Sequence, residues 1–293
     1  RLPLNYRHFE SDEEPFRYLE KGFERLEQAV KWCATHGLYV ILDLHSVQGW
    51  QNTDWHCDNP TRHSLFWKHP YFRDRFISLW EAFADKFKTE PVIAGYNIMN
   101  EPVTNSILSR YNNDDHPNWK MLNQIYHRTV NAIRSIDEKH IIFLEGDLFS
   151  NLFEGLDAPF DDNLVYSSHN YIPPCMGPGA YPGEIRGEYW KKDKIREEFV
   201  SRQGWEFTQK HNVPLWVGEF SCVFNGQPGE IPHRLKALED QIDIFEELGV
   251  HWTTWTYKDI GVMGWARVHP ESEYMKKIEP IQEAKRLLNV DLW

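Results

Sequence analysis

Short apolar runs of strand length alternate with longer amphipathic segments along the chain. Each apolar run is followed by loop residues, and the runs lie at residues 2–4, 38–44, 93–99, 140–144, 164–168, 214–217 and 251–256. Between them, helical periodicity predicts helices at residues 16–35, 70–88, 119–137, 191–211, 232–248 and 273–288. Because parallel strands need a helical crossover, the repeated strand–helix order predicts an α/β fold with a parallel sheet.

Seven predicted strands are one short of the eight that a closed parallel barrel needs. We therefore expect a single (β/α)₈-barrel domain over residues 1–293 that is incomplete at its N-terminus. Its first strand and helix are expected upstream of Arg1, in a segment on the order of 40 residues long. Two long connections, residues 46–69 and 172–190, are rich in aromatic and polar residues. Loops at the carboxyl ends of barrel strands usually shape a substrate cleft.

The amino-acid composition limits which classes of binding partner we expect for this domain. The 293 residues include 32 basic and 44 acidic side chains, and the net charge of -12 disfavours nucleic acid and anionic membrane surfaces. The 13 tryptophans suit sugar rings, whose C–H faces stack on indole. No apolar run approaches the roughly 18 residues of a membrane span. The four cysteines form no CxxC pair, so neither a zinc site nor a redox motif is visible.

Two glutamates follow buried, strand-like runs. Glu101 ends the segment from Gly95, and Glu219 ends the segment from Pro214. Since the carboxyl ends of parallel strands meet at one face of a barrel, these carboxylates can face each other although they lie far apart in the sequence. Glycoside cleavage needs one carboxyl that stays protonated until it gives its proton to the leaving oxygen, and one that stays ionised. Two glutamates in unlike surroundings supply both.

Other polar and aromatic residues lie at predicted strand ends and are candidates for holding the carboxylates or a sugar: Arg1, His45, Asn100, His169, Tyr171 and Trp255. Arg1 and Tyr171 are the best candidate donors for keeping Glu219 ionised. Asp43 beside His45 raises a metal-dependent hydrolase as an alternative. Such a site typically uses a His-x-His pair, which the chain lacks, and no metal site is expected.

One cluster resembles a metal site at first sight. It comprises His56, Cys57 and Asp58, with His63 nearby in the sequence. Its spacing matches no zinc motif, so we interpret this segment as a solvated loop.

Taken together, the strand-end residues resemble glycoside hydrolase family 5, the cellulase family, over essentially the whole chain. In order, the matching residues are Arg1, His45, Asn100, Glu101, His169, Tyr171, Glu219 and Trp255. The resemblance implies a retaining barrel glycosidase without metal or organic cofactor. It implies that Glu219 is the nucleophile and Glu101 the acid/base. The other six residues would orient Glu219 or bind the sugar at the cleavage point.

The expected substrate is a β-glucan or a gluco-oligosaccharide. The loop that begins at His45 resembles that of fungal-type exo-β-1,3-glucanases, which adds Trp50 and Asn52 as sugar-binding candidates. Residues 172–190 could wall the opposite side of the cleft with Tyr181, Tyr189 and Trp190. A β-mannan or another β-1,4-glycan is the alternative substrate, and a non-catalytic carbohydrate-binding barrel is the alternative class. The resemblance favours a secreted protein, with a cytoplasmic one left open, and no oligomeric state is predicted.

Overall fold

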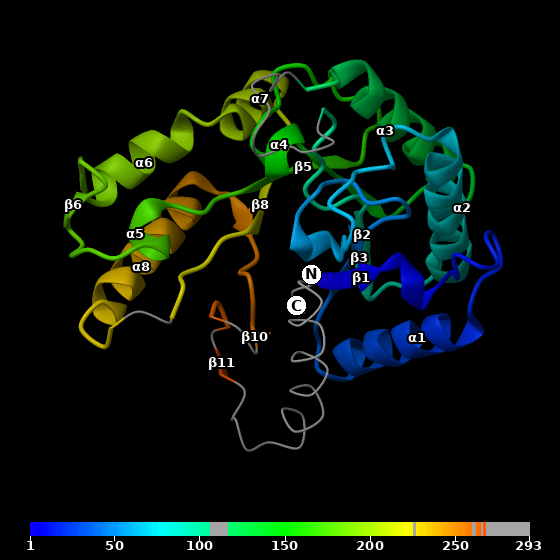
Figure 1. Cartoon of the computed structure of the whole chain (residues 1–293), viewed down its shortest axis with the longest axis horizontal. Coiled ribbons are helices and arrows are strands. Elements are labelled where there is room, and N and C mark those ends of the chain that lie inside the picture. Colours follow the sequence, from blue (N-terminus) through cyan, green and yellow to red (C-terminus); the bar gives the residue numbers. More distant parts are fainter. Residues whose placement is uncertain (106–116, 225–226, 260–261, 265, 268–293) are drawn as a thin grey trace. The chain divides into compact units, whose positions relative to one another are not determined.

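A computed structural model describes residues 1–105, 117–224, 227–259, 262–264 and 266–267 (Figure 1). The chain divides into two compact units, Arg1–Tyr166 and Ser167–Trp293. The helix expected at residues 273–288 lies outside the described residues. Within the described ranges, no helix is both long enough and apolar enough to cross a membrane.

The first unit is built on parallel strands in the order β1-β2-β3-β4. Their bounds are β1 (Leu2–Asn5), β2 (Val40–Ser46), β3 (Ile93–Asn97) and β4 (Ile141–Glu145), and the unit also contains the start of β5 (Leu164–His169). Leu42 in β2 pairs with Leu2 in β1 and with Tyr96 in β3. Gly95 allows β3 and β4 to approach closely, because a Cβ there would lie 2.2 Å from the Ile141 carbonyl oxygen.

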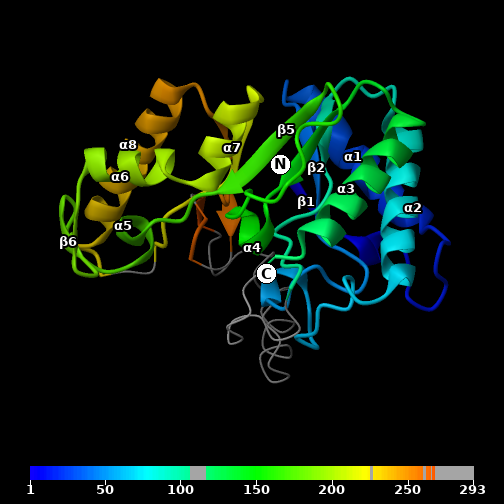
Figure 2. The ribbon, with the colours of Figure 1, turned by 90° about the horizontal axis from the view of Figure 1, so that it is seen from above.

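Three long helices pack on one face of the strands of the first unit (Figures 1 and 2). The helical segments are α1 (Glu20–Thr35), α2 (Pro70–Phe87), α3 (Trp119–Arg134), the short α4 (Asp147–Ser150), and the 3₁₀ turns η1 (Tyr6–His8) and η2 (Trp55–Cys57). Pro70 opens α2, where a missing N–H costs nothing, and the helix buries Phe76, Trp80 and Phe83 at helical spacing. The Asn118 side chain caps α3 by accepting from the Met121 N–H.

The second unit contains the strand order β5-β8-β9. Its further elements are α5 (Pro173–Met176), β6 (Gly183–Ile185), β7 (Glu188–Trp190), α6 (Lys192–Val200), α7 (Gln203–His211), β8 (Leu215–Glu219), α8 (Ile231–Leu248), β9 (His251–Trp252), β10 (Lys258–Asp259) and β11 (Ala266–Arg267). Strands β6 and β7 form an antiparallel hairpin, and β10 pairs with β11. Helix α8 is followed by Gly249, whose φ of 68° suits the left-handed position after a helix.

The predicted elements differ from the structure in several places. The helix expected at residues 191–211 is divided into α6 and α7, because Arg202 has extended backbone angles. Strand β3 ends at Asn97 rather than residue 99. Its continuation is irregular, because the Ile98 N–H bonds to Phe143 in β4 whereas the Asn100 N–H, two residues later, bonds to Leu44 in β2. Strand β9 stops at Trp252, short of the expected residue 256.

Candidate active site

Glu101 lies just beyond β3 in the first unit and is 8% exposed. Its φ of 48° is in the left-handed region that non-glycine residues rarely adopt. Two hydrogen bonds hold this backbone: its N–H donates to Glu145 Oε2 at 2.7 Å, and its carbonyl accepts from Asn52 Nδ2 at 2.9 Å. The unfavourable conformation is therefore held by specific partners at a buried carboxyl, which is typical of a functional position.

Arg1 lies at the centre of a buried network in the same unit. Its Nη2 donates to Asn100 Oδ1 at 2.6 Å and lies 3.2 Å from carboxylate oxygens of both Asp43 and Glu145. Its Nε donates to Asn97 Oδ1 at 3.1 Å. Two carboxylates thus offset the cost of burying the guanidinium, and the guanidinium orients Asn100. The predicted action of Arg1 on Glu219 stays a prediction.

His45 completes the positioning of Asn100. Its Nδ1 lies 2.9 Å from Asp43 Oδ2, and its Nε2 lies 3.3 Å from Asn100 Nδ2. Because the amide oxygen of Asn100 accepts from Arg1, its nitrogen is the donor toward His45. His45 Nε2 is then an acceptor, and Nδ1 carries the proton toward Asp43. Asp43 and His45, the pair that suggested a metal-dependent hydrolase as an alternative, are hydrogen-bonded to each other.

Glu145 is a residue of the site that sequence reasoning missed. It ends β4 and is fully buried. Its carboxylate accepts from the Glu101 N–H and the Ser150 hydroxyl and pairs with Arg1. The signal that identified Glu101 and Glu219, an acid directly after an apolar strand, also marks Glu145 and could have found it.

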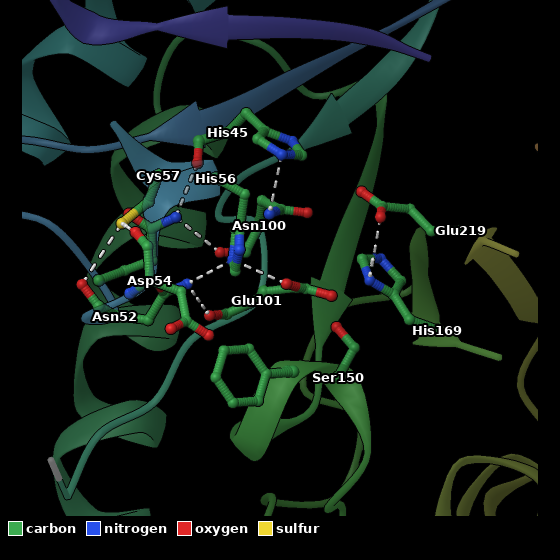
Figure 3. Close-up of polar contacts among 12 residues, drawn as sticks. His45, Asn52, Asp54, His56, Cys57, Asn100, Glu101, Ser150, His169 and Glu219 are labelled. Carbon is green, nitrogen blue, oxygen red and sulfur yellow. Dashed lines mark hydrogen bonds and ion pairs between the residues drawn. The ribbon is translucent and has the colours of Figure 1, made fainter. Parts of the chain in front are cut away.

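The loop at residues 46–69 is not the solvated segment that its spacing suggested. Cys57 is completely buried, and its thiol donates to the carbonyl oxygens of Asn52 and Asp54. Burial raises the pKa of this thiol well above its usual range, so Cys57 is a structural group. His56, a site residue that the sequence pattern does not reveal, places Nε2 2.9 Å from Glu101 Oε2 (Figure 3). The signal missed was the packing of the loop, which spacing alone does not reveal.

The two sugar-binding candidates of this loop differ in their surroundings. Asn52 is fully buried, and its amide bonds to the Asp54 N–H, the Glu101 carbonyl and His56. Trp50 is partly exposed, and the Arg7 guanidinium lies 5.4 Å from its ring centroid. Asn52 therefore holds the backbone of Glu101, and sugar contacts at Asn52 and Trp50 stay predictions.

Glu219 ends β8 in the second unit and is 5% exposed. The Tyr171 hydroxyl donates to its Oε2 at 2.9 Å, and His169 Nδ1 lies 3.7 Å from the same oxygen. Gly218 makes this arrangement possible, because a Cβ there would lie 2.6 Å from Ser167 Oγ and 3.2 Å from His169 Nε2. Three of the predicted residues, His169, Tyr171 and Glu219, thus lie together, and the Glu219 carboxylate accepts from the Tyr171 hydroxyl.

The aromatic candidates of the second unit fall into two groups. Trp255 is partly exposed and follows β9. Its backbone N–H donates to the Phe220 carbonyl oxygen at 3.0 Å. Tyr181 and Trp190 belong instead to the hydrophobic core of this unit, so their predicted role as a cleft wall is wrong. Of that group only Tyr189 is exposed, at 65%. The buried rings of Tyr181 and Trp190 hold residues 172–190 in place.

Each unit thus contains one of the two predicted catalytic carboxyls, nearly buried and with its own set of polar partners. Glu101 faces an imidazole, and Glu219 faces a phenolic hydroxyl. A carboxyl next to an imidazole can exchange a proton, whereas a carboxylate that accepts from a hydroxyl is stabilised in its ionised form. These are the two chemical states that acid-assisted displacement at a glycosidic carbon requires.

Comparison with known proteins identifies the family of the chain. Residues 1–261 match the model of the family described as cellulase (glycosyl hydrolase family 5). A β-xylosidase of Phanerodontia chrysosporium is 34% identical over the whole chain, and the chain spans 60% of the length of that relative. Endoglucanase C of Acetivibrio thermocellus is 25% identical over 88% of the chain and 79% of the relative.

Solved structures share the fold. A glycoside hydrolase structure covers 99% of the chain and is itself covered to 87%, with a TM-score of 0.70 and 20% identity. An endo-glycoceramidase II from Rhodococcus sp. covers 90% of the chain and is covered to 65%, with a TM-score of 0.68 and 20% identity. The predicted α/β-barrel fold class is confirmed. With its family model matched from residue 1 to residue 261, the chain belongs to glycosyl hydrolase family 5, the cellulase family, and is a glycoside hydrolase.

Proposed function

We propose that the protein is a retaining β-glycoside hydrolase in which Glu219 is the nucleophile and Glu101 the acid/base. The observation that carries the proposal is the difference between the two carboxyl environments. Glu219 Oε2 accepts from the Tyr171 hydroxyl, which favours the ionised form that a nucleophile needs. Glu101 Oε2 faces His56 Nε2, a group with which it can share a proton.

The reaction proceeds in two displacements. Glu219 attacks the anomeric carbon while Glu101 gives its proton to the glycosidic oxygen, and the electron pair of the breaking C–O bond leaves with that oxygen. A covalent glycosyl-enzyme forms. Glu101, now a carboxylate, then takes a proton from water, and the water oxygen displaces Glu219 from the anomeric carbon. Asn100, held by Arg1 and His45, is positioned to bond a hydroxyl of the reacting sugar.

The substrate class that we propose is β-glucan or gluco-oligosaccharide. Relatives named endoglucanase and cellodextrinase support it. The relative named β-xylosidase, at 34% identity, favours β-xylosides as a second candidate. A solved relative at 18% identity is described in complex with a mannotriose substrate, which leaves β-mannan as the alternative from within the family.

Hydrolysis of a panel of aryl β-glucosides, β-xylosides and β-mannosides, together with β-glucans, tests the proposal. We expect turnover of at least one β-linked substrate, with the first product in the β configuration by NMR. Initial release of the α anomer would overturn the retaining mechanism. A crystal structure offers a second test, because retention requires carboxyl groups about 5–5.5 Å apart and inversion about 6.5–9.5 Å.

A further inference from the structure

The amide of Asn52 has only one orientation that satisfies its partners. Its Oδ1 accepts from the Asp54 N–H at 2.9 Å, and its Nδ2 donates to the Glu101 carbonyl oxygen at 2.9 Å. Exchanging the two amide atoms would place oxygen against oxygen and nitrogen against N–H. The nitrogen of Asn52 is therefore the atom that faces His56.

His56 Nε2 lies between two groups (Figure 3). Asn52 Nδ2 is 3.0 Å away, and Glu101 Oε2 is 2.9 Å away. One N–H of Asn52 bonds to the Glu101 carbonyl, so its other N–H is directed at the imidazole. A proton on Nε2 would oppose this donor, whereas the lone pair of neutral imidazole accepts from it. With Nε2 bare, the proton between His56 and Glu101 belongs to the carboxyl.

We propose that His56 is a positioning residue that, together with Asn52, keeps the proton of the acid/base on Glu101 in the resting enzyme. The inference rests on the proposed role of Glu101 and extends it to a residue of the 46–69 loop. After Glu101 has given up its proton, its Oε2 faces a nitrogen without a hydrogen, which favours recovery of a proton from the attacking water. The same contact thus supports both displacements.

Further titratable and charged groups surround this pair within the first unit. Glu145 accepts from the Glu101 N–H, and Arg1 binds Glu145. The ring of His45 lies 6.2 Å from that of His56 and is itself bonded to Asp43. Asp54 is buried on the same loop, and its N–H is held by Asn52. The ring of Phe149 lies edge-on to the imidazole with 6.0 Å between centroids, and the side chains of His56 and Glu101 are 15% and 11% exposed, so the contact is largely shielded from water.

The pH dependence of kcat/KM tests this assignment in His56→Gln and His56→Phe. We expect His56→Phe to move the alkaline fall in rate about one pH unit toward lower pH, because the protonated carboxyl loses its acceptor. His56→Gln keeps an acceptor oxygen and should lie between this variant and the wild type. A shift of the alkaline fall toward higher pH would overturn the proposal, since it would show that His56 is a cation in the resting enzyme.

The leaving group supplies a second readout that a merely structural role would not move. A dinitrophenyl leaving group needs no proton, so kcat/KM of His56→Phe for such a substrate should be close to that of the wild type. For a substrate with an unsubstituted phenyl leaving group, kcat/KM of the variant should be about tenfold lower. Equal losses with both would contradict the proposal. The matched control is His63→Gln, an exposed histidine of the same loop, which should keep the wild-type profile.

Glu101→Ala separates failure of this inference from failure of the proposed function. If Glu101 is the acid/base, this variant should lose activity selectively with poor leaving groups, and azide should restore turnover. A Glu101→Ala variant without this selectivity would refute the proposed function itself. Selectivity in Glu101→Ala with wild-type behaviour in both His56 variants would refute only the role of His56.

Discussion

Glu101 and Glu219 differ in the backbone that carries them and in the side chains that surround them. Glu219 is the last residue of β8, and a neighbouring residue of the second unit, Tyr171, donates directly to it. Glu101 lies beyond the end of β3 on a left-handed backbone, and its partners come from β4 and from the 46–69 loop. A nucleophile needs a fixed direction of attack, which a strand supplies. An acid/base needs a tuned proton, which requires additional side chains around it.

The largest effect is expected at Glu219, the proposed nucleophile. Glu219→Gln should lower kcat by about 10⁴-fold or more with every leaving group, because an amide cannot form the glycosyl ester. Steady-state kinetics on an aryl β-glycoside measures it, with circular dichroism as the check on folding. Glu206→Gln, an exposed glutamate of α7, is the control. Loss confined to poor leaving groups would mean that the two glutamates have exchanged roles.

Glu145 tests whether Glu101 depends on partners outside its own segment. Glu145→Gln should lower kcat by about 10–100-fold, because the charged acceptor of the Glu101 N–H is lost and Arg1 loses one of the carboxylates that pair with it. KM should change less than kcat. Glu138→Gln, at an exposed position of the same unit, should leave both constants unchanged. Wild-type kcat in Glu145→Gln would show that Glu101 needs no such support.

Tyr171 tests the simpler surroundings of Glu219. Tyr171→Phe removes one hydroxyl donor while it keeps the ring, so kcat should fall about tenfold and the melting temperature should change little. Tyr39→Phe, at a tyrosine exposed directly before β2, is the matched control. If Tyr171→Phe retained full activity, the ionised state of Glu219 would have to be maintained by other donors.

The smallest effect on activity is expected at a carboxylate that only stabilises the fold. Burial raises the pKa of Asp137, but hydrogen bonds from Tyr96, Lys139 and His140 outweigh it and hold the pKa below its usual range. Its stabilisation is therefore fully present above the unfolded pKa of about 3.9 and is lost as the pH falls through the folded value.

Asp137→Asn should cost about 1 kcal/mol of unfolding free energy at neutral pH and should weaken the acid dependence of stability, with unchanged kcat. Urea unfolding at pH 7 and at pH 3 measures both. A large loss of activity would mean that Asp137 contributes to the reaction and does not only stabilise the fold.

Most of the fold and both carboxyls could be predicted because buried strands have a readable pattern. Val217 before Glu219 and Ile98 before Glu101 are fully buried, so each acid had to follow the core. The proposed role of His56 could not be predicted from a pattern of apolar residues. It depends on the fold of an irregular loop, which Asn59 closes by donating to the Asn52 and His63 carbonyl oxygens. Such contacts have no period in the sequence.

The left-handed backbone of Glu101 has a consequence for the evolution of the chain. An asparagine tolerates this conformation better than a glutamate does, so Glu101→Asn should relieve strain on the order of 1 kcal/mol while it removes the proposed acid/base. The inactive variant would then be more heat-resistant than the enzyme. Selection for stability alone would discard this glutamate, and its presence at such a position is a mark of selection for turnover.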